Sequence, residues 1–245
     1  MSEGSAFDVV IGAGSGIGGA LIERWQSAAE RPLLAIARSS ERLSSLACMQ
    51  GVACEATDYS DEQLARLTET LLECGADVVR LVICNGVLQG EGYRPERALS
   101  QLEGAAMQKV FELNTFLPMR VLSALMPVIK QSGSPKIAVL SARVGSISDN
   151  RLGGWYSYRG SKAALNMMLK CAAIELRRVN PQAKLMAYHP GTVDTPLSKP
   201  FQASVSAEKL FSPARAAAAL DTVLNGFEVE GDLAYLDWQG QPIPW

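Results

Sequence analysis

Short apolar segments alternate along the chain with longer segments in which apolar residues recur every three or four positions. The short segments are apolar on both faces, which is typical of parallel strands that helices cover on both sides. They predict strands at 7–11, 32–36, 51–54, 78–84, 136–140, 183–188 and 233–236. The periodic segments predict helices at 17–29, 40–48, 60–73, 95–102, 104–131, 156–179 and 213–226. This alternation predicts an α/β fold, a doubly wound parallel sheet of about seven strands with helices on both faces.

No repeat or linker divides the chain, so we expect a single domain over residues 1–245. The stretch 191–212 is the longest one without a clear helix or strand pattern. Long irregular segments in compact domains are often binding loops. We therefore expect a substrate loop at 191–212, with a poorly ordered loop as the alternative.

The composition narrows the range of partners. The 245 residues are 48% hydrophobic and 20% charged, with a net charge of −2. Since neither sign of charge dominates, we expect no nucleic acid and no anionic membrane as partner. The N-terminus has no secretory signal pattern and the five cysteines form no CxxC pair, so we expect a cytoplasmic protein with reduced thiols. With one histidine, no metal site is expected.

A glycine-rich loop, GAGSGIG, follows the first predicted strand and opens the first predicted helix. Glycines let the backbone turn tightly and approach a pyrophosphate, toward which the helix directs its N-terminal N–H groups. A purely structural turn is the alternative. We expect dinucleotide phosphates to be bound through Gly12, Gly14, Ser15, Gly16, Ile17 and Gly18.

The residues at the end of the second predicted strand indicate which nicotinamide cofactor is preferred, NAD(H) or NADP(H). An acidic residue at this place would bind the ribose 2′-hydroxyl of NAD, but this chain has Ala37 followed by Arg38 and Ser39. A guanidinium fits a 2′-phosphate, and the carboxylate that would repel this phosphate is missing. We therefore expect NADP(H) to be preferred over NAD(H), unless Arg38 is only a solvated loop residue.

Tyr158 and Lys162 lie four residues apart at the start of the predicted helix 156–179, so they share one face of it. An ammonium beside a phenol lowers the phenol pKa from its ordinary value of about 10. The pair is then suited to proton transfer with a carbonyl or an alcohol. Tyr156 is a second phenol, but Gly160 stands four residues after it. A surface helix with a solvated lysine is the alternative.

Pro118 gives Asn114 a candidate role. An α-helix pairs the N–H of residue i with the carbonyl of residue i−4, and proline has no N–H. The carbonyl of Asn114 would therefore be free to hold a water that passes protons to Lys162. A proline kink without chemistry is the alternative.

The spacings Gly12-x-x-x-Gly16-x-Gly18 and Tyr158-x-x-x-Lys162 resemble the short-chain dehydrogenase/reductase family, whose fold is the Rossmann fold. That family usually has threonine before the first glycine, where this chain has Ile11. The stretches GGWYSYRGSKAALN, HPGTVDTPLSKPF and QPIPW resemble the branch with the bacterial C-factor proteins and the fly carbonyl reductase sniffer.

The resemblance implies further site residues. Ser141, directly after the fifth strand, would hydrogen-bond the substrate oxygen, with Ser146 as the alternative, and Asn114 would bind the relay water. Tyr158 and Lys162 would also contact the cofactor. The other implied cofactor residues are Asp58 at the adenine, Asn85 and Gly86 in a partial motif, and Pro190, Gly191, Val193 and Thr195 over the nicotinamide. The alternatives are that Asp58 or Ser60 is a helix N-cap and that His189 has a structural role.

The resemblance implies an NADPH-dependent reductase that transfers hydride between nicotinamide and a small-molecule carbonyl or alcohol, with Tyr158 as general acid/base. The alternative is a cofactor-binding cell–cell signalling or sensor protein with incidental catalysis. The presence of Tyr158, Lys162, Ser141 and Asn114 favours the enzyme. A homodimer or homotetramer is expected from the family and from the apolar surfaces of the predicted helices 104–131 and 156–179.

Overall fold

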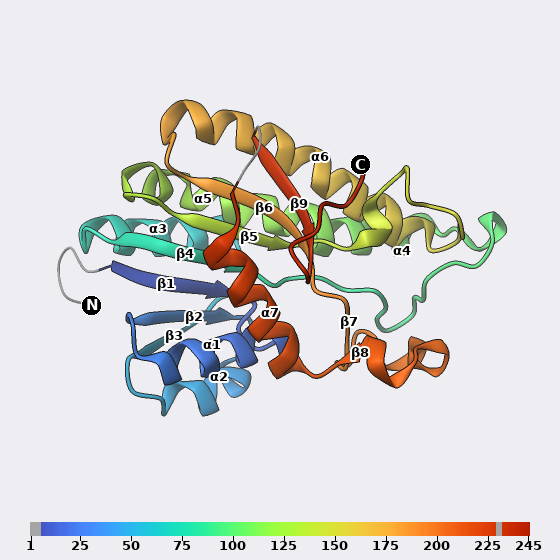
Figure 1. The fold of residues 1–245 in the computed structure, drawn as a ribbon, viewed down its shortest axis with the longest axis horizontal. Coiled ribbons are helices and arrows are strands. Elements are labelled where there is room, and N and C mark those ends of the chain that lie inside the picture. The colour runs from blue at the N-terminus through green and yellow to red at the C-terminus, as the bar shows by residue number, and fades with distance from the viewer. Residues whose placement is uncertain (1–5, 229–231) are drawn as a thin grey trace.

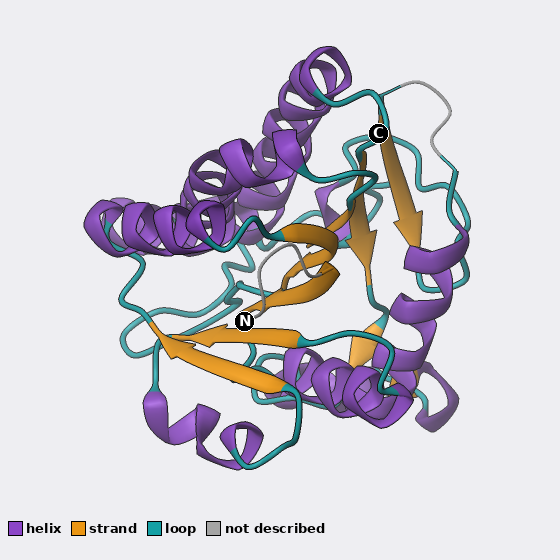
Figure 2. Cartoon of the chain, turned by 90° about the vertical axis from the view of Figure 1, so that its left-hand side faces the viewer, coloured by secondary structure: helices purple, strands orange, loops and turns teal. Residues whose placement is uncertain are grey.

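A seven-stranded sheet lies between two layers of helices (Figures 1 and 2). The computed structural model describes residues 6–228 and 232–245. Its main strands are β1 (Ala6–Ile11), β2 (Leu33–Ala37), β3 (Val52–Ala56), β4 (Asp77–Ile83), β5 (Lys136–Leu140), β6 (Lys184–His189) and β9 (Leu233–Asp237). They are ordered β3-β2-β1-β4-β5-β6-β9, and every neighbouring pair is parallel. The predicted α/β architecture is confirmed.

The central strand β1 shows why these strands are continuously apolar. Its residue Val9 belongs to the core beneath α3 (Asp61–Glu73), α5 (Leu117–Gln131) and α6 (Tyr156–Val179). The next residue, Val10, belongs to the opposite core, beneath α1 (Gly16–Ala28), α2 (Ser40–Ala47) and α7 (Pro213–Gly226). Successive side chains of a strand point to opposite faces, so a strand covered on both sides is apolar at every position.

Two predicted helices differ from the observed ones. The segment predicted as a helix at 95–102 contains only a 3₁₀ turn, Leu99–Gln101. The helix predicted at 104–131 is α4 (Gly104–Phe111), a π-helical turn (Glu112–Phe116) and then α5. In the π turn the N–H of Leu117 bonds to the carbonyl of Glu112, five residues earlier. The hydrogen-bond register therefore slips by one residue directly before Pro118, which has no N–H to donate.

The segment 191–212 has more regular structure than its sequence predicts. Its β7 (Thr192–Val193) pairs in parallel with β8 (Leu210–Phe211), and 3₁₀ segments cover Lys199–Ser204 and Ala207–Lys209. These elements are too short to give a periodic pattern. In the part of the chain that the structure describes, no helix is long and apolar enough to cross a membrane.

Candidate active site

The sequence-predicted residues lie in loops at the carboxyl edge of the sheet. All strands of a parallel sheet run the same way, so the loops that follow β1, β4, β5 and β6 meet at one edge, on the right of Figure 1. The start of α6 lies at the same edge, because Lys162 in its second turn contacts the last residue of β5.

Lys162 is buried with its ammonium against the sheet. The side chain is 3% exposed, and Nζ donates to the carbonyl of Leu140 at 2.7 Å. Burial lowers the pKa of Lys162 to about 7, since the apolar surroundings penalise the charged form. The amine can therefore change its charge near neutral pH.

Tyr158 lies one helical turn before Lys162 on the same face of α6. Burial raises the pKa of Tyr158 to about 12, with a smaller contribution from the nearby Tyr235 phenol. The prediction that the lysine lowers this pKa is therefore wrong. Lys162 is engaged with Leu140, and desolvation of the phenol outweighs any attraction from the ammonium.

Ser141 follows β5 and is held by a residue that the sequence analysis did not select. Its hydroxyl donates to Oδ1 of Asn166 at 2.6 Å, and both residues are buried. Asn166 lies one turn after Lys162, so Tyr158, Lys162 and Asn166 follow one another at four-residue intervals. The alternative hydroxyl, that of Ser146, instead accepts the N–H of Asp149 within its own loop. The Ser141 proton is thus directed at Asn166 while Ser146 acts as an acceptor, and the choice of Ser141 over Ser146 stays a prediction.

Asn114 lies inside the π turn and is fully buried. Its Oδ1 accepts the N–H of Val87 at 2.7 Å, and its Nδ2 donates to the Val87 carbonyl and to the hydroxyl of Ser161. A Cβ added at Gly86 would lie 3.4 Å from Asn114 Oδ1 and 3.5 Å from Lys162 Nζ. The Asn114 side chain therefore fixes the loop after β4 beside Lys162, while the water relay through its carbonyl stays a prediction.

The glycine loop has the tight backbone that its sequence predicts. Gly12 has a φ of +79°, and a Cβ added at Gly18 would lie 2.6 Å from the Gly12 carbonyl oxygen. The hydroxyl of Ser15 caps α1 by accepting the N–H of Gly18, so α1 begins at Gly16. Ile17 is buried, and Gly14 packs against Arg42. The loop leaves backbone N–H groups at the start of a helix, as the phosphates of a dinucleotide require.

The end of β2 is where the sequence predicts a site for the 2′-phosphate of NADP(H). Ala37 is buried as the last residue of the strand, and the exposed Arg38 follows it. The hydroxyl of Ser39 caps α2 by accepting the N–H of Arg42 at 3.4 Å. A phosphate at this point would meet the start of α2 together with one guanidinium.

Asp58 and Ser60 share the turn before α3. Asp58 accepts the N–H of Ser60 at 2.7 Å, and this hydrogen bonding lowers the pKa of Asp58. Ser60 caps α3 by accepting the N–H of Gln63. The N-cap is therefore Ser60, and an adenine contact by Asp58 stays a prediction.

The turn after β6 reaches the glycine loop. A Cβ added at Gly16 would lie 2.9 Å from the Thr195 methyl, and Gly191, with a φ of +78°, packs against Phe211. Pro190 and Val193 frame the same turn. Burial lowers the pKa of His189 to about 4, so this imidazole is neutral, consistent with its structural reading.

Asn85 provides an orphaned buried oxygen at this edge. Within residues 6–228 and 232–245, its Oδ1 is buried without a hydrogen-bond partner. A Cβ added at Gly12 would lie 3.3 Å from the same oxygen. The narrow glycine backbone and this free acceptor fit a bound dinucleotide.

Three further residues connect the start of α6 to distant segments. The Trp155 ring packs edge-on against Tyr158 and Phe201, with centroids 6.2 and 5.2 Å apart. The backbone carbonyl of Glu96 accepts the Trp155 N–H at 2.5 Å. No local sequence pattern singles out Trp155, Phe201 or Glu96, because only the fold brings them together. Phe201 of the segment 191–212 thus packs on Trp155, which in turn packs on Tyr158, and the role of this segment as a substrate loop stays a prediction.

The sheet, its glycine loop and the residues at its carboxyl edge define a Rossmann-fold oxidoreductase with a nicotinamide cofactor. Residues 8–206 match the model of the short chain dehydrogenase family. The chain belongs to the short-chain dehydrogenase family and is an NAD(P)-dependent oxidoreductase acting on a small molecule.

Two curated relatives are similar over about 60% of the chain. C-signal of Myxococcus xanthus is 32% identical over 148 residues, which cover 60% of this chain and 84% of that protein. The 1-hydroxy-2-glutathionyl-2-methyl-3-butene dehydrogenase of Rhodococcus sp. (strain AD45) is 31% identical over 147 residues, or 60% of this chain and 62% of that one.

Solved structures share the fold over nearly the whole chain. NADPH-bound carbonyl reductase from chicken fatty liver superposes with a TM-score of 0.83 at 21% identity, covering 100% of both chains. Carbonyl reductase Sniffer of D. melanogaster superposes with a TM-score of 0.82 at 18% identity, covering 99% of this chain and 100% of that one. At these identities the similarity shows the fold.

Proposed function

We propose that the protein is an NADPH-dependent reductase of aldehydes or ketones with Tyr158 as its general acid. The observation that carries this proposal is the group formed by Tyr158, Lys162 and Ser141 at the edge of the sheet that also holds the glycine loop. This edge of the sheet therefore brings together a proton donor, a buried cation and a hydroxyl for the substrate oxygen.

The phenol of Tyr158 is in the protonation state that reduction of a carbonyl needs. With its pKa raised to about 12, Tyr158 keeps its proton at neutral pH and is ready to donate it. A nicotinamide held at the glycine loop would supply the hydride that the carbonyl carbon receives. Ser141 turns its hydroxyl proton from Asn166 to the substrate oxygen, and that oxygen, as it gains negative charge, takes the Tyr158 proton. Lys162 in its charged form then stabilises the phenolate that remains.

The test is carbonyl-dependent consumption of NADPH. Phenanthrenequinone and a series of aliphatic and aromatic aldehydes should each be offered, and the loss of NADPH absorbance followed. Tyr158→Phe should reduce turnover by at least a hundredfold while NADPH still binds, because only the acidic proton is removed. Tyr156→Phe is the matched control and should keep near wild-type turnover. A Tyr158→Phe protein within tenfold of wild type would refute the assignment.

NADPH rather than NADH is proposed from the end of β2. Ala37 leaves no carboxylate to repel a 2′-phosphate, and Arg38 is exposed beside it. Solved structures with the same fold hold NADP or NADPH, which is consistent with this preference.

A second candidate function is cell–cell signalling, which the similarity to C-signal favours. In that case the cofactor would bind but turnover would be incidental. The same assay separates the two functions: a protein that binds NADPH tightly yet consumes none with any carbonyl offered would favour signalling.

We also propose that the chain works in the cytoplasm as a homodimer or homotetramer. Phe116, Met167 and Ile174 are exposed along the π turn and α6, with exposed fractions of 45%, 66% and 37%. Apolar groups on neighbouring helices are suited to a self-complementary contact. Light scattering that shows a monomer at micromolar concentration would refute the oligomer.

A further inference from the structure

The loop between β4 and α4 is fixed at both ends. Near its start, Asn114 holds both backbone groups of Val87. At its other end, the buried Glu96 accepts the N–H of Ser157 at 3.2 Å and also the hydroxyl of Ser157. The loop therefore has a defined position relative to α6, the helix of Tyr158.

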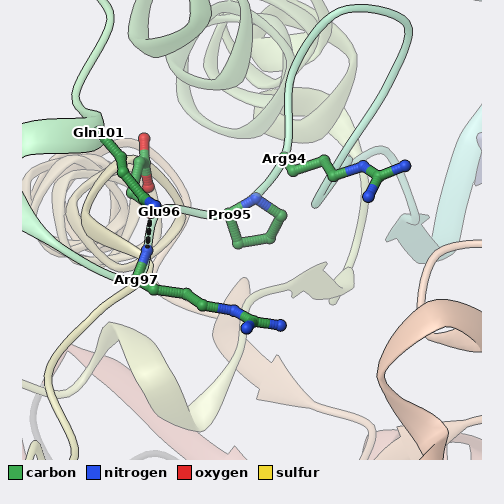
Figure 3. A pocket seen from close by; sticks show the side chains of 5 residues that line it. All are labelled: Arg94, Pro95, Glu96, Arg97 and Gln101. Carbon is green, nitrogen blue, oxygen red and sulfur yellow. Dashed lines mark hydrogen bonds between the residues drawn. The ribbon is translucent and has the colours of Figure 1, made fainter.

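Two arginines extend from this loop into one pocket. The pocket has a volume of about 450 Å³ and is lined by Arg94, Pro95, Glu96, Arg97 and Gln101. Figure 3 shows that the Arg94 and Arg97 side chains extend in the same direction, one on each side of Pro95. Within the described ranges 6–228 and 232–245, neither guanidinium has a hydrogen-bond or ion-pair partner, and Arg97 uses only its backbone N–H, toward Gln101.

The one acid in the lining is already used. Figure 3 shows the Glu96 carboxylate pointing away from the two guanidiniums. It lies at the start of α6, where it receives the hydrogen bonds of Ser157 and the favourable field of the helix N-terminus. The two cations therefore keep their capacity to bind an external anion.

The arginine pair lies next to the residues that approach Tyr158. A Cβ added at Gly154 would lie 3.3 Å from the Glu96 carbonyl and 4.0 Å from the Arg97 Cα. The next residue, Trp155, packs its ring against that of Tyr158. The loop that carries Arg94 and Arg97 therefore packs beside Gly154 and Trp155, the residues that lead into Tyr158.

We propose that Arg94 and Arg97 form an anion subsite for the substrate, which would be an aldehyde or ketone that carries a carboxylate or phosphate away from its carbonyl. This proposal rests on the proposed function. A guanidinium binds either group through paired charge-assisted hydrogen bonds. The cofactor carries a 2′-phosphate as well, and the experiment must distinguish it from an acidic group of the substrate.

The first test is binding, which needs no turnover. Benzene-1,4-dicarboxylate and its uncharged diamide should be titrated calorimetrically into the full-length protein with saturating NADP⁺. The dicarboxylate should bind at least tenfold more tightly than the diamide. Arg94→Gln with Arg97→Gln should abolish this difference, whereas Arg178→Gln, an exposed arginine at the far end of α6, should preserve it. Equal affinities for the two probes, or a preference that survives the double substitution, would overturn the subsite.

The second test separates the anion's source from the protein's function. The double variant should lower kcat/KM for 4-formylbenzoate at least tenfold relative to 4-formylbenzamide and leave phenanthrenequinone reduction unchanged. A loss of NADPH affinity without a loss of NADH affinity would assign the arginines to the cofactor and overturn the substrate subsite. Charge-selective probe binding in a protein that reduces no carbonyl would instead overturn the proposed function and leave an anion site.

Discussion

Replacing Lys162 by methionine should make the protein inactive but more stable, by an amount that depends on pH. Lys162 is buried at 3% exposure, with the Leu140 carbonyl as its hydrogen-bond partner. Methionine has a similar length and no charge, so the substitution removes the ammonium without opening a large cavity.

The magnitude follows from the pKa. One pKa unit corresponds to about 1.4 kcal/mol, so lowering the pKa of Lys162 from 10.5 to about 7 costs the folded state roughly 5 kcal/mol while the amine is charged. Methionine leaves the Leu140 carbonyl without its donor, at a cost of about 1–3 kcal/mol. The variant should therefore be about 2–4 kcal/mol more stable than wild type at pH 6.

The sign of the stability difference between Lys162→Met and wild type reverses at high pH. Below pH 7 the amine is charged in the folded and the unfolded state, so wild type bears the full cost of burial. Between pH 7 and pH 10.5 the folded amine is neutral while the unfolded one still binds a proton, so wild-type stability rises with pH. Near pH 10.5 only the lost hydrogen bond remains, and the variant should be the less stable protein.

Urea unfolding of the cofactor-free proteins at pH 6 to 10 measures this difference. Lys130→Met is the control, because Lys130 is exposed on α5 and is solvated in both states. A stability difference between wild type and Lys162→Met that is constant across this range would refute the assigned burial of the charge. So would a variant less stable than wild type at pH 6.

The remaining predictions concern the cofactor, the start of α6 and the Ser141 hydroxyl. Ala37→Asp combined with Arg38→Ala should reverse a preference for NADPH, measured as the ratio of the two dissociation constants; an original protein that prefers NADH would contradict the reasoning. Glu96→Ala should lower the free energy of unfolding by about 2–4 kcal/mol, because it leaves buried donors unpaired, and chemical denaturation checks it; a change below about 0.5 kcal/mol, as for a typical surface substitution, would show the contact to be weak. Asn166→Leu should lower kcat more than it raises KM, because the Ser141 oxygen is no longer held in position to turn its proton toward the substrate; unchanged kcat would exclude that role.

The sequence by itself determines the architecture, because its signals are local. A strand buried on both faces has to be apolar at every position, and a helix on a sheet has to be apolar on one face, so periodicity predicts the layers. The glycine loop and the four-residue spacing of Tyr158 and Lys162 are local in the same way. Gly12 needs its positive φ and Gly18 its missing Cβ wherever the rest of the chain lies.

Tertiary structure decides what depends on distant residues. Glu96 lies in the segment 95–102, which the sequence predicts as a helix. In the structure it binds Ser157, 61 positions away in the sequence, and this contact outweighs the local helix propensity. The π turn before Pro118 holds the buried Asn114, whose side chain binds Val87 and Ser161. No local sequence pattern reveals Val87 or Ser161 as a partner of Asn114.

The pKa of the Tyr158 phenol shows the physical reason most directly. From the sequence, the ammonium of Lys162 is the nearest influence on Tyr158, and it predicts a lowered pKa. In the folded protein, burial governs both groups: it raises the pKa of Tyr158 and lowers that of Lys162. Spacing along a helix determines which side chains are neighbours, but only the packing of the other elements determines how much water remains around them, and this sets their charge.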